Sequence, residues 1–324
     1  INLQSALTAV STCGITGPVT FTLAPYTHRG GMSLATLNGA SATNTVTFQG
    51  PATGTATIQG AAGQFAAVVL NGTDYLTLRK LRIVHPTASG IVLTGGAHDI
   101  VIDENEIIAD TVGTTSTLAA IASSANLTSV TGYGNNANNI TITDNVIKGG
   151  YYGVRFNGTS TTSFSTGINL SGNTITKAYY YGTYFYYMGN LTVNDNVVRG
   201  LRNSTNYGHY LYYVGNVTME RNDVFVSYYA ITLGYLNNQA KPAANRVIAN
   251  NMFASTTSYG GYFPYPRHVN MYHNTFKGSS YGCYMLTSTG TSQSKVLNIR
   301  NNIFQGGTYA FYFSGTSMDS VTMD

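Results

Sequence analysis

One phrase occurs seven times along this chain, and it restricts the fold more than any other feature of the sequence. It first reads ITITDNVIKGGYYGVRF, beginning at Ile140, and every later copy carries an asparagine at the same place. Apolar residues stand three and five positions before the asparagines, apart from Arg246 five positions before Asn251, which is the period-2 pattern of a β-strand. The asparagines are Asn145, Asn173, Asn196, Asn222, Asn251, Asn274 and Asn302, and Asn105 fits one repeat earlier.

The spacing of these asparagines predicts a parallel β-helix. Successive copies from Asn145 onward lie 23 to 29 residues apart, which suits one solenoid turn of two or three short strands. Leucine-rich repeats need a leucine framework that this chain lacks, and propeller blades are longer. Asparagine tolerates the dihedral angles of turns, and its amide can bond to the next copy in a stack, so we expect an asparagine ladder. We predict an all-β fold, a right-handed single-stranded parallel β-helix.

The residues before the repeats predict a cap. Leu3, Ala6, Leu7 and Val10 fall on one helical face, and such a face could cover the open core of the first solenoid turn. We therefore expect a capping helix within residues 1–17.

Residues 18–324 are predicted to form the β-helix, with regular repeats from about residue 98 to the end. Asn105 and Asn145 lie 40 residues apart, which indicates an insertion at about 110–138. The last residues, SVTMD, repeat the start of NVTMERN and then stop. We expect the chain to be a fragment that ends within a solenoid turn, with the native protein continuing beyond it.

A second pattern follows each asparagine and concerns tyrosine. It runs tyrosine, glycine or alanine, any residue, usually tyrosine, and then a large apolar residue, as in YGTYF at 181–185. Because alternate residues of a strand face opposite sides, the third and fifth positions should face the core and the fourth should face outward. Tyr181, at the first position, marks the start of its strand. The fourth position holds Arg155, Tyr184, Tyr210, Thr232, Tyr262, Tyr284 and Tyr312.

This outward column has two interpretations. Parallel strands stack about 4.8 Å apart, so tyrosine, a strong β-former, could stabilise the sheet by stacking on its own copies. Flat exposed rings at regular spacing could also make a platform for sugar rings, because tyrosine combines an apolar body with a polar tip. The five tyrosines of the fourth position and Arg155 are therefore our candidate carbohydrate-binding residues.

The sequence gives little support for catalytic or metal chemistry. Enzymes on this fold usually act on polysaccharides through paired carboxylates, or through Ca²⁺ with a basic partner. The one dense acidic group is DENE, where Asp103, Glu104 and Glu106 are a weak Ca²⁺ candidate and otherwise a solvated turn. No other metal and no cofactor is predicted, no catalytic residue is identified, and we lean against an enzyme.

We interpret the isolated histidine and cysteine residues as structural. His209 falls on an inward position, where a core histidine is the simpler expectation. Cys13 and Cys283 lie far apart in a solenoid whose turns contact only their neighbours, so we expect them to be unpaired.

Charge and hydropathy exclude two classes of partner. Only 9% of the residues are charged, and the net charge of +4 is not gathered into a basic run, which argues against a nucleic-acid partner. No apolar run approaches the length needed to cross a bilayer.

The opening text, LQSALTAVSTCGITGPVTFTLAPYTHRGGMSLATLNGASATNTVTFQG, resembles the start of large surface proteins exported by the type IX route in Bacteroidetes. The specific part covers residues 3–50, and LNGTDYLTLRKLRI at 70–83 is similar to the next strand of that family. The resemblance implies a right-handed, pectin-lyase-like β-helix, display at the cell surface, and the type IX secretion machinery as a partner. Such proteins include adhesins and polysaccharide lyases.

We therefore expect an extracellular, adhesin-like β-helix that binds polysaccharides, cell-surface glycans or other surfaces through its outward tyrosines. Two alternatives stay open. One is a polysaccharide lyase or glycoside hydrolase with a groove on the β-helix, and the other is a passive structural stalk whose tyrosines bind nothing.

Overall fold

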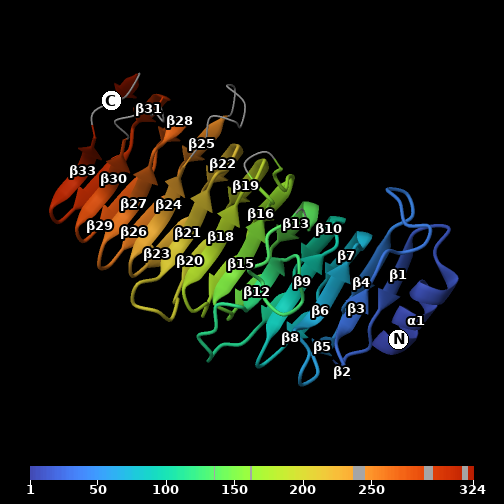
Figure 1. Ribbon diagram of the computed structural model, residues 1–324. Helices are drawn as coiled ribbons and strands as arrows, with labels where there is room; N and C mark the ends of the chain where they lie inside the picture. The colour runs from blue at the N-terminus through green and yellow to red at the C-terminus, as the bar shows by residue number, and fades with distance from the viewer. Residues whose placement is uncertain (135, 161–162, 236–244, 288–294, 316–319) are drawn as a thin grey trace.

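A computed structural model describes residues 1–134, 136–160, 163–235, 245–287, 295–315 and 320–324. The described chain forms a parallel β-helix, as the sequence predicts. Each turn contributes one strand to each of three sheets, and each strand pairs in parallel with its counterpart in the next turn. Figure 1 shows the turns stacked one on another, from helix α1 at one end to the C-terminus at the other.

The first sheet alternates inward apolar with outward polar residues, as in β13, where Ile140 and Ile142 are buried between partly buried threonines. In order of pairing, its strands are β1 (Val19–Thr22), β4 (Val46–Gln49), β7 (Asp74–Arg79), β10 (Ala97–Asp103), β13 (Ala137–Thr143), β16 (Ile168–Ser171), β19 (Asn190–Asn194), β22 (Asn216–Glu220), β25 (Arg246–Ala249), β28 (Arg267–Tyr272), β31 (Lys295–Arg300) and β34 (Val321–Met323).

The second sheet is built from the short strands that follow the asparagines, and its central residues, such as Ile147 and Val198, are fully buried. Its strands are β2 (Thr27–Arg29), β5 (Thr57–Gln59), β8 (Arg82–Val84), β11 (Glu106–Ile108), β14 (Val146–Lys148), β17 (Thr174–Thr176), β20 (Val197–Arg199), β23 (Asp223–Val226), β26 (Met252–Ser255), β29 (Thr275–Gly278) and β32 (Ile303–Gly306).

The third sheet carries the tyrosine-rich text, and its strands run in a row along the whole solenoid (Figure 1). They are β3 (Met32–Leu34), β6 (Ala66–Asn71), β9 (Ser89–Thr94), β12 (Ala119–Ser123), β15 (Tyr152–Asn157), β18 (Tyr181–Tyr186), β21 (Tyr207–Tyr212), β24 (Tyr229–Gly234), β27 (Tyr259–Pro264), β30 (Tyr281–Leu286) and β33 (Tyr309–Ser314).

The asparagine ladder is confirmed, and it runs without a break from Asn105 to Asn302. Each Nδ2 donates to the Oδ1 of the next asparagine at 2.8 to 3.1 Å. Each Oδ1 also accepts the backbone N–H of the preceding asparagine at 2.9 to 3.1 Å. Leu81 takes the ladder position one turn earlier, where its backbone N–H donates to Asn105 Oδ1. The ladder therefore satisfies buried polar groups between turns.

The sharp bend at each corner falls on the residue before the ladder asparagine, rather than on the asparagine as expected. Glu104, Asp144, Asp195, Arg221 and His273 all have φ between 53° and 56°. This is the left-handed region, which polar residues with short side chains tolerate best and which here redirects the chain from the first sheet to the second.

Helix α1 (Leu3–Cys13) covers the N-terminal end of the solenoid (Figure 1). The side chain of Asn2 caps it by accepting the backbone N–H of Ser5 at 3.2 Å. Leu3, Ala6 and Val10 are buried against the core, so the amphipathic face supplies the apolar cover that an open solenoid end needs.

The segment at 110–138 is not wholly an insertion, because it contains β12, a regular strand of the third sheet that pairs with β9 and β15. The additional residues lie in the connections on either side of β12, of which the second includes residues 124–134. In the described residues, no helix is long and apolar enough to cross a membrane.

Candidate functional site: the tyrosine surface

The third sheet carries two adjoining columns of tyrosine on its outer side, which we call the tyrosine surface. The fourth position of each strand faces outward, as predicted, and supplies Tyr184, Tyr210, Tyr262, Tyr284 and Tyr312. The first position faces the same side, because rings of the two columns touch: Tyr181 and Tyr210 have centroids 5.3 Å apart. The first-position column is Tyr152, Tyr181, Tyr207, Tyr229, Tyr259, Tyr281 and Tyr309.

The first and fourth positions share the outer face because the second and third positions both point inward, which interrupts the usual alternation along the strand. In β18, Gly182 and Thr183 are both buried between the partly buried Tyr181 and Tyr184. A Cβ at Gly182 would lie 2.5 Å from Cγ1 of Val198, which belongs to the second sheet across the core. Glycine or alanine at this position thus lets the backbone approach the core and turns the first tyrosine outward.

The rings stack on one another along the solenoid. Tyr184 and Tyr210 have centroids 5.0 Å apart with planes 7° from parallel, and Tyr284 is nearly parallel to both Tyr262 and Tyr312 at 5.5 and 5.4 Å. This offset stacking covers part of each ring face with the next ring. A ligand would therefore meet ring edges, hydroxyl groups and partly overlapped faces, rather than the open flat platform expected from the sequence.

Arg155 lies in the outward column but is not exposed, which corrects its place among the candidates for ligand contact. Its side chain is only 2% exposed, since residues 124–134 fold over it and the Val130 carbonyl accepts a hydrogen bond from its Nη1. Its guanidinium also lies over the rings of Tyr152 and Tyr184, 5.1 and 5.0 Å from the centroids. Burial by a distant segment was not visible in the strand pattern.

Thr232 interrupts the fourth-position column, as the sequence indicates. It is 1% exposed and pairs in register with Tyr210 on one side and Tyr262 on the other. The column therefore consists of one stack at Tyr184 and Tyr210 and a second at Tyr262, Tyr284 and Tyr312, while the first-position column continues past the interruption through Tyr229.

Crowding raises the pKa of several phenol groups of the tyrosine surface. Burial, followed by the electrostatic effect of neighbouring tyrosines, raises the pKa of Tyr262 to about 12. The same causes raise the pKa values of Tyr181, Tyr184 and Tyr210 still further. The hydroxyl groups thus remain neutral donors and acceptors over the whole physiological range.

An alkaline titration should detect this packing. The folded state favours the protonated phenols, so their contribution to stability is fully present below pH 10, the ordinary tyrosine pKa, and is lost as the pH rises through about 12. We expect tyrosinate absorbance of the folded protein to appear at higher pH than that of the urea-unfolded chain. Superimposable titration curves for the two states would contradict the packed surface.

His209 and Cys283 are core residues, as expected. His209 is fully buried, hydrogen-bonds through Nδ1 to Thr183 Oγ1 at 2.9 Å, and has its pKa lowered to about 3 by burial. Burial likewise raises the pKa of the Cys283 thiol. Because both side chains are buried, His209 and Cys283 lack the exposure that catalysis needs. Neither Cys13 nor Cys283 is in a disulfide.

The carboxylates of the DENE segment form ion pairs with neighbouring basic side chains. Glu104 pairs with Arg79, and Glu106 pairs with Arg82 and Lys148 at 2.9 and 2.7 Å. Hydrogen bonds from Lys148 and Arg82 lower the pKa of Glu106 despite partial desolvation. Calcium at Asp103, Glu104 and Glu106 stays a prediction, and the ion would have to displace these cations.

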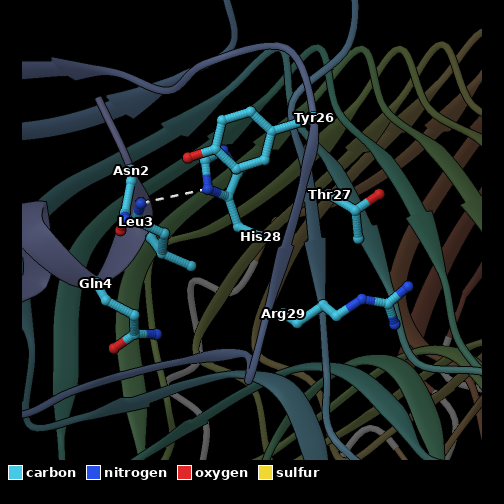
Figure 2. A pocket seen from close by; sticks show the side chains of 7 residues that line it. All are labelled: Asn2, Leu3, Gln4, Tyr26, Thr27, His28 and Arg29. Carbon is cyan, nitrogen blue, oxygen red and sulfur yellow. Dashed lines mark hydrogen bonds between the residues drawn. The ribbon is translucent and has the colours of Figure 1, made fainter.

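A small pocket of about 240 Å³ lies beside the N-terminal cap and is shown in Figure 2. Its histidine is tied to the backbone on both sides: Nδ1 of His28 accepts the Leu3 N–H at 3.3 Å, and Nε2 donates to the Ala24 carbonyl at 3.1 Å. The ring of Tyr26 lies against it, with centroids 4.2 Å apart. These contacts join α1 to the first turn, so we interpret His28 as a structural residue.

Comparison with known proteins supports this architecture. The model of the family described as periplasmic copper-binding protein (NosD) matches residues 115–310. No curated protein sequence matches the chain.

Solved structures with the same fold include an adhesin and carbohydrate-active enzymes. The Streptococcus pneumoniae surface protein and adhesin PfbA superposes with a TM-score of 0.50 at 11% identity, over 94% of this chain and 83% of that one. The periplasmic alginate epimerase AlgG gives 0.53 at 10% identity, over 100% and 83%. The GH136 lacto-N-biosidase of Eubacterium ramulus gives 0.53 at 11% identity, over 98% and 64%. Identities this low establish a common fold only.

Proposed function

The chain belongs to the NosD family, and from this starting point we propose that it acts outside the cytoplasm as an adhesin-like β-helix that binds glycans through its tyrosine surface. The observation that carries the proposal is the two adjoining columns of partly buried tyrosines along β15 to β33. Tyrosine is favoured at binding surfaces because a rigid apolar ring carries a hydroxyl group that can pair with a ligand.

The same sheet provides an internal comparison. In its earlier turns the outward fourth position is held by Val69, Val92 and Ala122, which pair in register with one another and then with Arg155. The fold therefore does not require tyrosine in this column. Val92 and Ala122 are buried, whereas the fourth-position tyrosines are partly exposed, so tyrosine occupies the column where it becomes accessible to a ligand.

Binding is preferred to catalysis because of where the carboxylates lie. Hydrolysis of a glycosidic bond in most enzymes uses two carboxyl groups facing the substrate, and the strands of the third sheet that bear the tyrosine surface, β15 to β33, contain no Asp or Glu. In the first sheet, Asp195 is occupied by both Nε and Nη2 of Arg221.

Copper, which the family description names, does not fit the residues present. Copper takes imidazole and thiolate ligands, but in the described ranges no three His or Cys side chains gather where they could hold a metal ion. Cys283 is buried, and its raised pKa disfavours the thiolate. We assign copper no role in the proposed function.

Surface display is part of the same proposal. The text at residues 3–50, which resembles that of type IX-exported proteins, supports delivery to the cell surface with that secretion machinery as a partner. Immunolabelling of intact cells with and without a functional type IX system would test this, and unchanged surface labelling without the system would remove that partner.

The double variant Tyr210→Ala/Tyr262→Ala tests glycan binding. These rings border Thr232 on the two stacks, and removing both should lower retention on a glycan array at least about tenfold, as expected for aromatic contact residues. Circular dichroism should remain that of a β-helix. The matched control is Tyr272→Ala, because Tyr272 lies on the first sheet, where its hydroxyl donates to Asn270 at 3.1 Å, and this change should leave retention unaltered.

Three other outcomes would decide against the proposal. Equal retention by the wild type and a folded double variant would exclude the tyrosine surface as the binding site. No retention on any glycan or cell surface by the wild type would favour the passive stalk. Release of reducing ends or of unsaturated uronates from a polysaccharide would favour the hydrolase or lyase.

A further inference from the structure

The scarcity of charged side chains on the tyrosine surface indicates which class of glycan it can bind. Resting on the proposed function, we infer that the ligand is an uncharged polysaccharide, a polymer of neutral sugars without carboxylate or sulfate groups. The inference names the substrate class from the chemistry of the third sheet, since its strands from β15 to β33 all lie in the described part of the chain.

These strands carry almost no ionisable side chain other than tyrosine. The exceptions are Arg155, His209 and Cys283. His209 and Cys283 point inward and are fully buried. Arg155 is covered by residues 124–134, and its guanidinium is already engaged with the Val130 carbonyl and two tyrosine rings. Within the described strands β15 to β33, no cation is therefore presented to an acidic ligand.

A carboxylate or sulfate would be poorly accommodated on such a surface. An anion that leaves water needs a cation or several N–H donors, and arginine or lysine normally supplies them. Phenol groups whose pKa values are raised offer only neutral donors and acceptors. These groups match the hydroxyl groups of neutral sugars, and the partly overlapped ring faces match their C–H faces.

Three described cations near these strands in the sequence belong to other contacts or to another face. Arg202 donates to the Val112 and Gly113 carbonyls at 2.8 and 2.6 Å and lies over the ring of Tyr179. Arg199 pairs with Asp223. Lys277 lies in β29, on the exposed side of the second sheet. None of them extends the tyrosine surface itself.

The repeat of the surface also favours a regular polymer. Tyr262, Tyr284 and Tyr312 present one ring per turn, with centroids 5.5 and 5.4 Å apart. An extended polysaccharide lying along the solenoid would thus meet the same pattern of ring edges and hydroxyl groups at every turn, and each contact would add to the others.

Polymer pairs that differ only in charge test the inference. Polygalacturonan with its carboxyl groups methyl-esterified is compared with the same polymer de-esterified, and β-1,4-mannan is compared with β-1,4-polymannuronate, by affinity electrophoresis of the full chain. We expect the neutral member of at least one pair to bind at least about tenfold more tightly than its acidic counterpart. This binding should not weaken between low and high salt, because no charge pair contributes to it.

A charge-introducing variant provides the matched control. Tyr284→Arg should raise affinity for de-esterified polygalacturonan in a salt-sensitive way, whereas Tyr284→Gln, which is polar but neutral, should not. Tighter, salt-sensitive binding of the acidic polymers by the wild type would overturn the inference while leaving glycan binding in place. Binding of no polymer from either pair or from the glycan array would overturn the proposed function itself.

Discussion

Replacing Asn196 by alanine is expected to destabilise the β-helix by at least about 3 kcal/mol. Asn196 is fully buried, donates through Nδ2 to the Leu170 carbonyl at 2.8 Å, and accepts the backbone and side-chain N–H groups of Asn173 at 3.0 and 3.1 Å. Alanine would remove all these partners, and each buried group left without one costs about 1–3 kcal/mol. Urea denaturation followed by circular dichroism measures the loss.

A second, exposed row of asparagines provides the control. Asn216 donates to Asn190 at 2.8 Å and accepts the backbone N–H of Asn245 at 3.0 Å, so it makes the same kind of link between turns. Because water can replace an exposed partner, Asn216→Ala should cost less than about 1 kcal/mol. Equal losses for the two variants would show that burial does not give the inner ladder its importance.

The fold was predictable because each turn of a solenoid contacts only its neighbours. A repeat in the sequence therefore maps directly onto a repeat in space, and the position of Asn145 fixes what lies above and below it. The period-2 pattern located the strands of the first and second sheets for the same reason. The left-handed φ was misplaced by one residue, since a pattern of residue types does not distinguish the corner residue Asp144 (φ 55°) from the ladder residue beside it.

Only one of the two tyrosine columns of the candidate site could be predicted from the sequence. The fourth-position tyrosines follow from alternation, but the first-position column does not, because the glycine that breaks the alternation acts across the core. Gly182 is required by Val198 of another sheet, a contact that strand periodicity cannot reveal. The recurrence of glycine or alanine after every first-position tyrosine was the available signal.

The burial of Arg155 shows a different limit. Its position in the strand is the outward one, and only the course of residues 124–134 decides that it is covered. That segment has no repeat partner in the sequence, so nothing in the periodicity indicates where it lies. Irregular connections thus determine which part of a repetitive surface is covered, and here Tyr133 of that segment also contacts the rings of Tyr186 and Tyr187 in the next turn.

The substitution Gly208→Val should be about as damaging as the loss of the buried asparagine, and it links the fold to the tyrosine surface. A Cβ at Gly208 would lie 2.3 Å from the Ala230 carbonyl oxygen and 2.4 Å from Cγ1 of Val224. Neither contact can be relieved without moving the backbone of β21, so we expect a loss of about 3 kcal/mol or more in the free energy of unfolding. Gly17→Val, at a site with nothing within 4 Å of the new carbon and no positive φ, should cost less than about 0.5 kcal/mol.

Gly208→Val should also weaken glycan binding, an effect that a measurement of stability does not detect. Moving β21 away from the core would displace Tyr207 and Tyr210, which flank this glycine on the outer face, and so separate the ring of Tyr210 from that of Tyr184. Retention on the glycan array should then fall under conditions where the protein remains folded, and Gly208→Ala should act in the same direction but less strongly, because its Cβ makes the same two close contacts without the two additional methyl groups of valine. A valine variant with unchanged stability and unchanged retention would show that the close approach of strand and core does not orient the tyrosines.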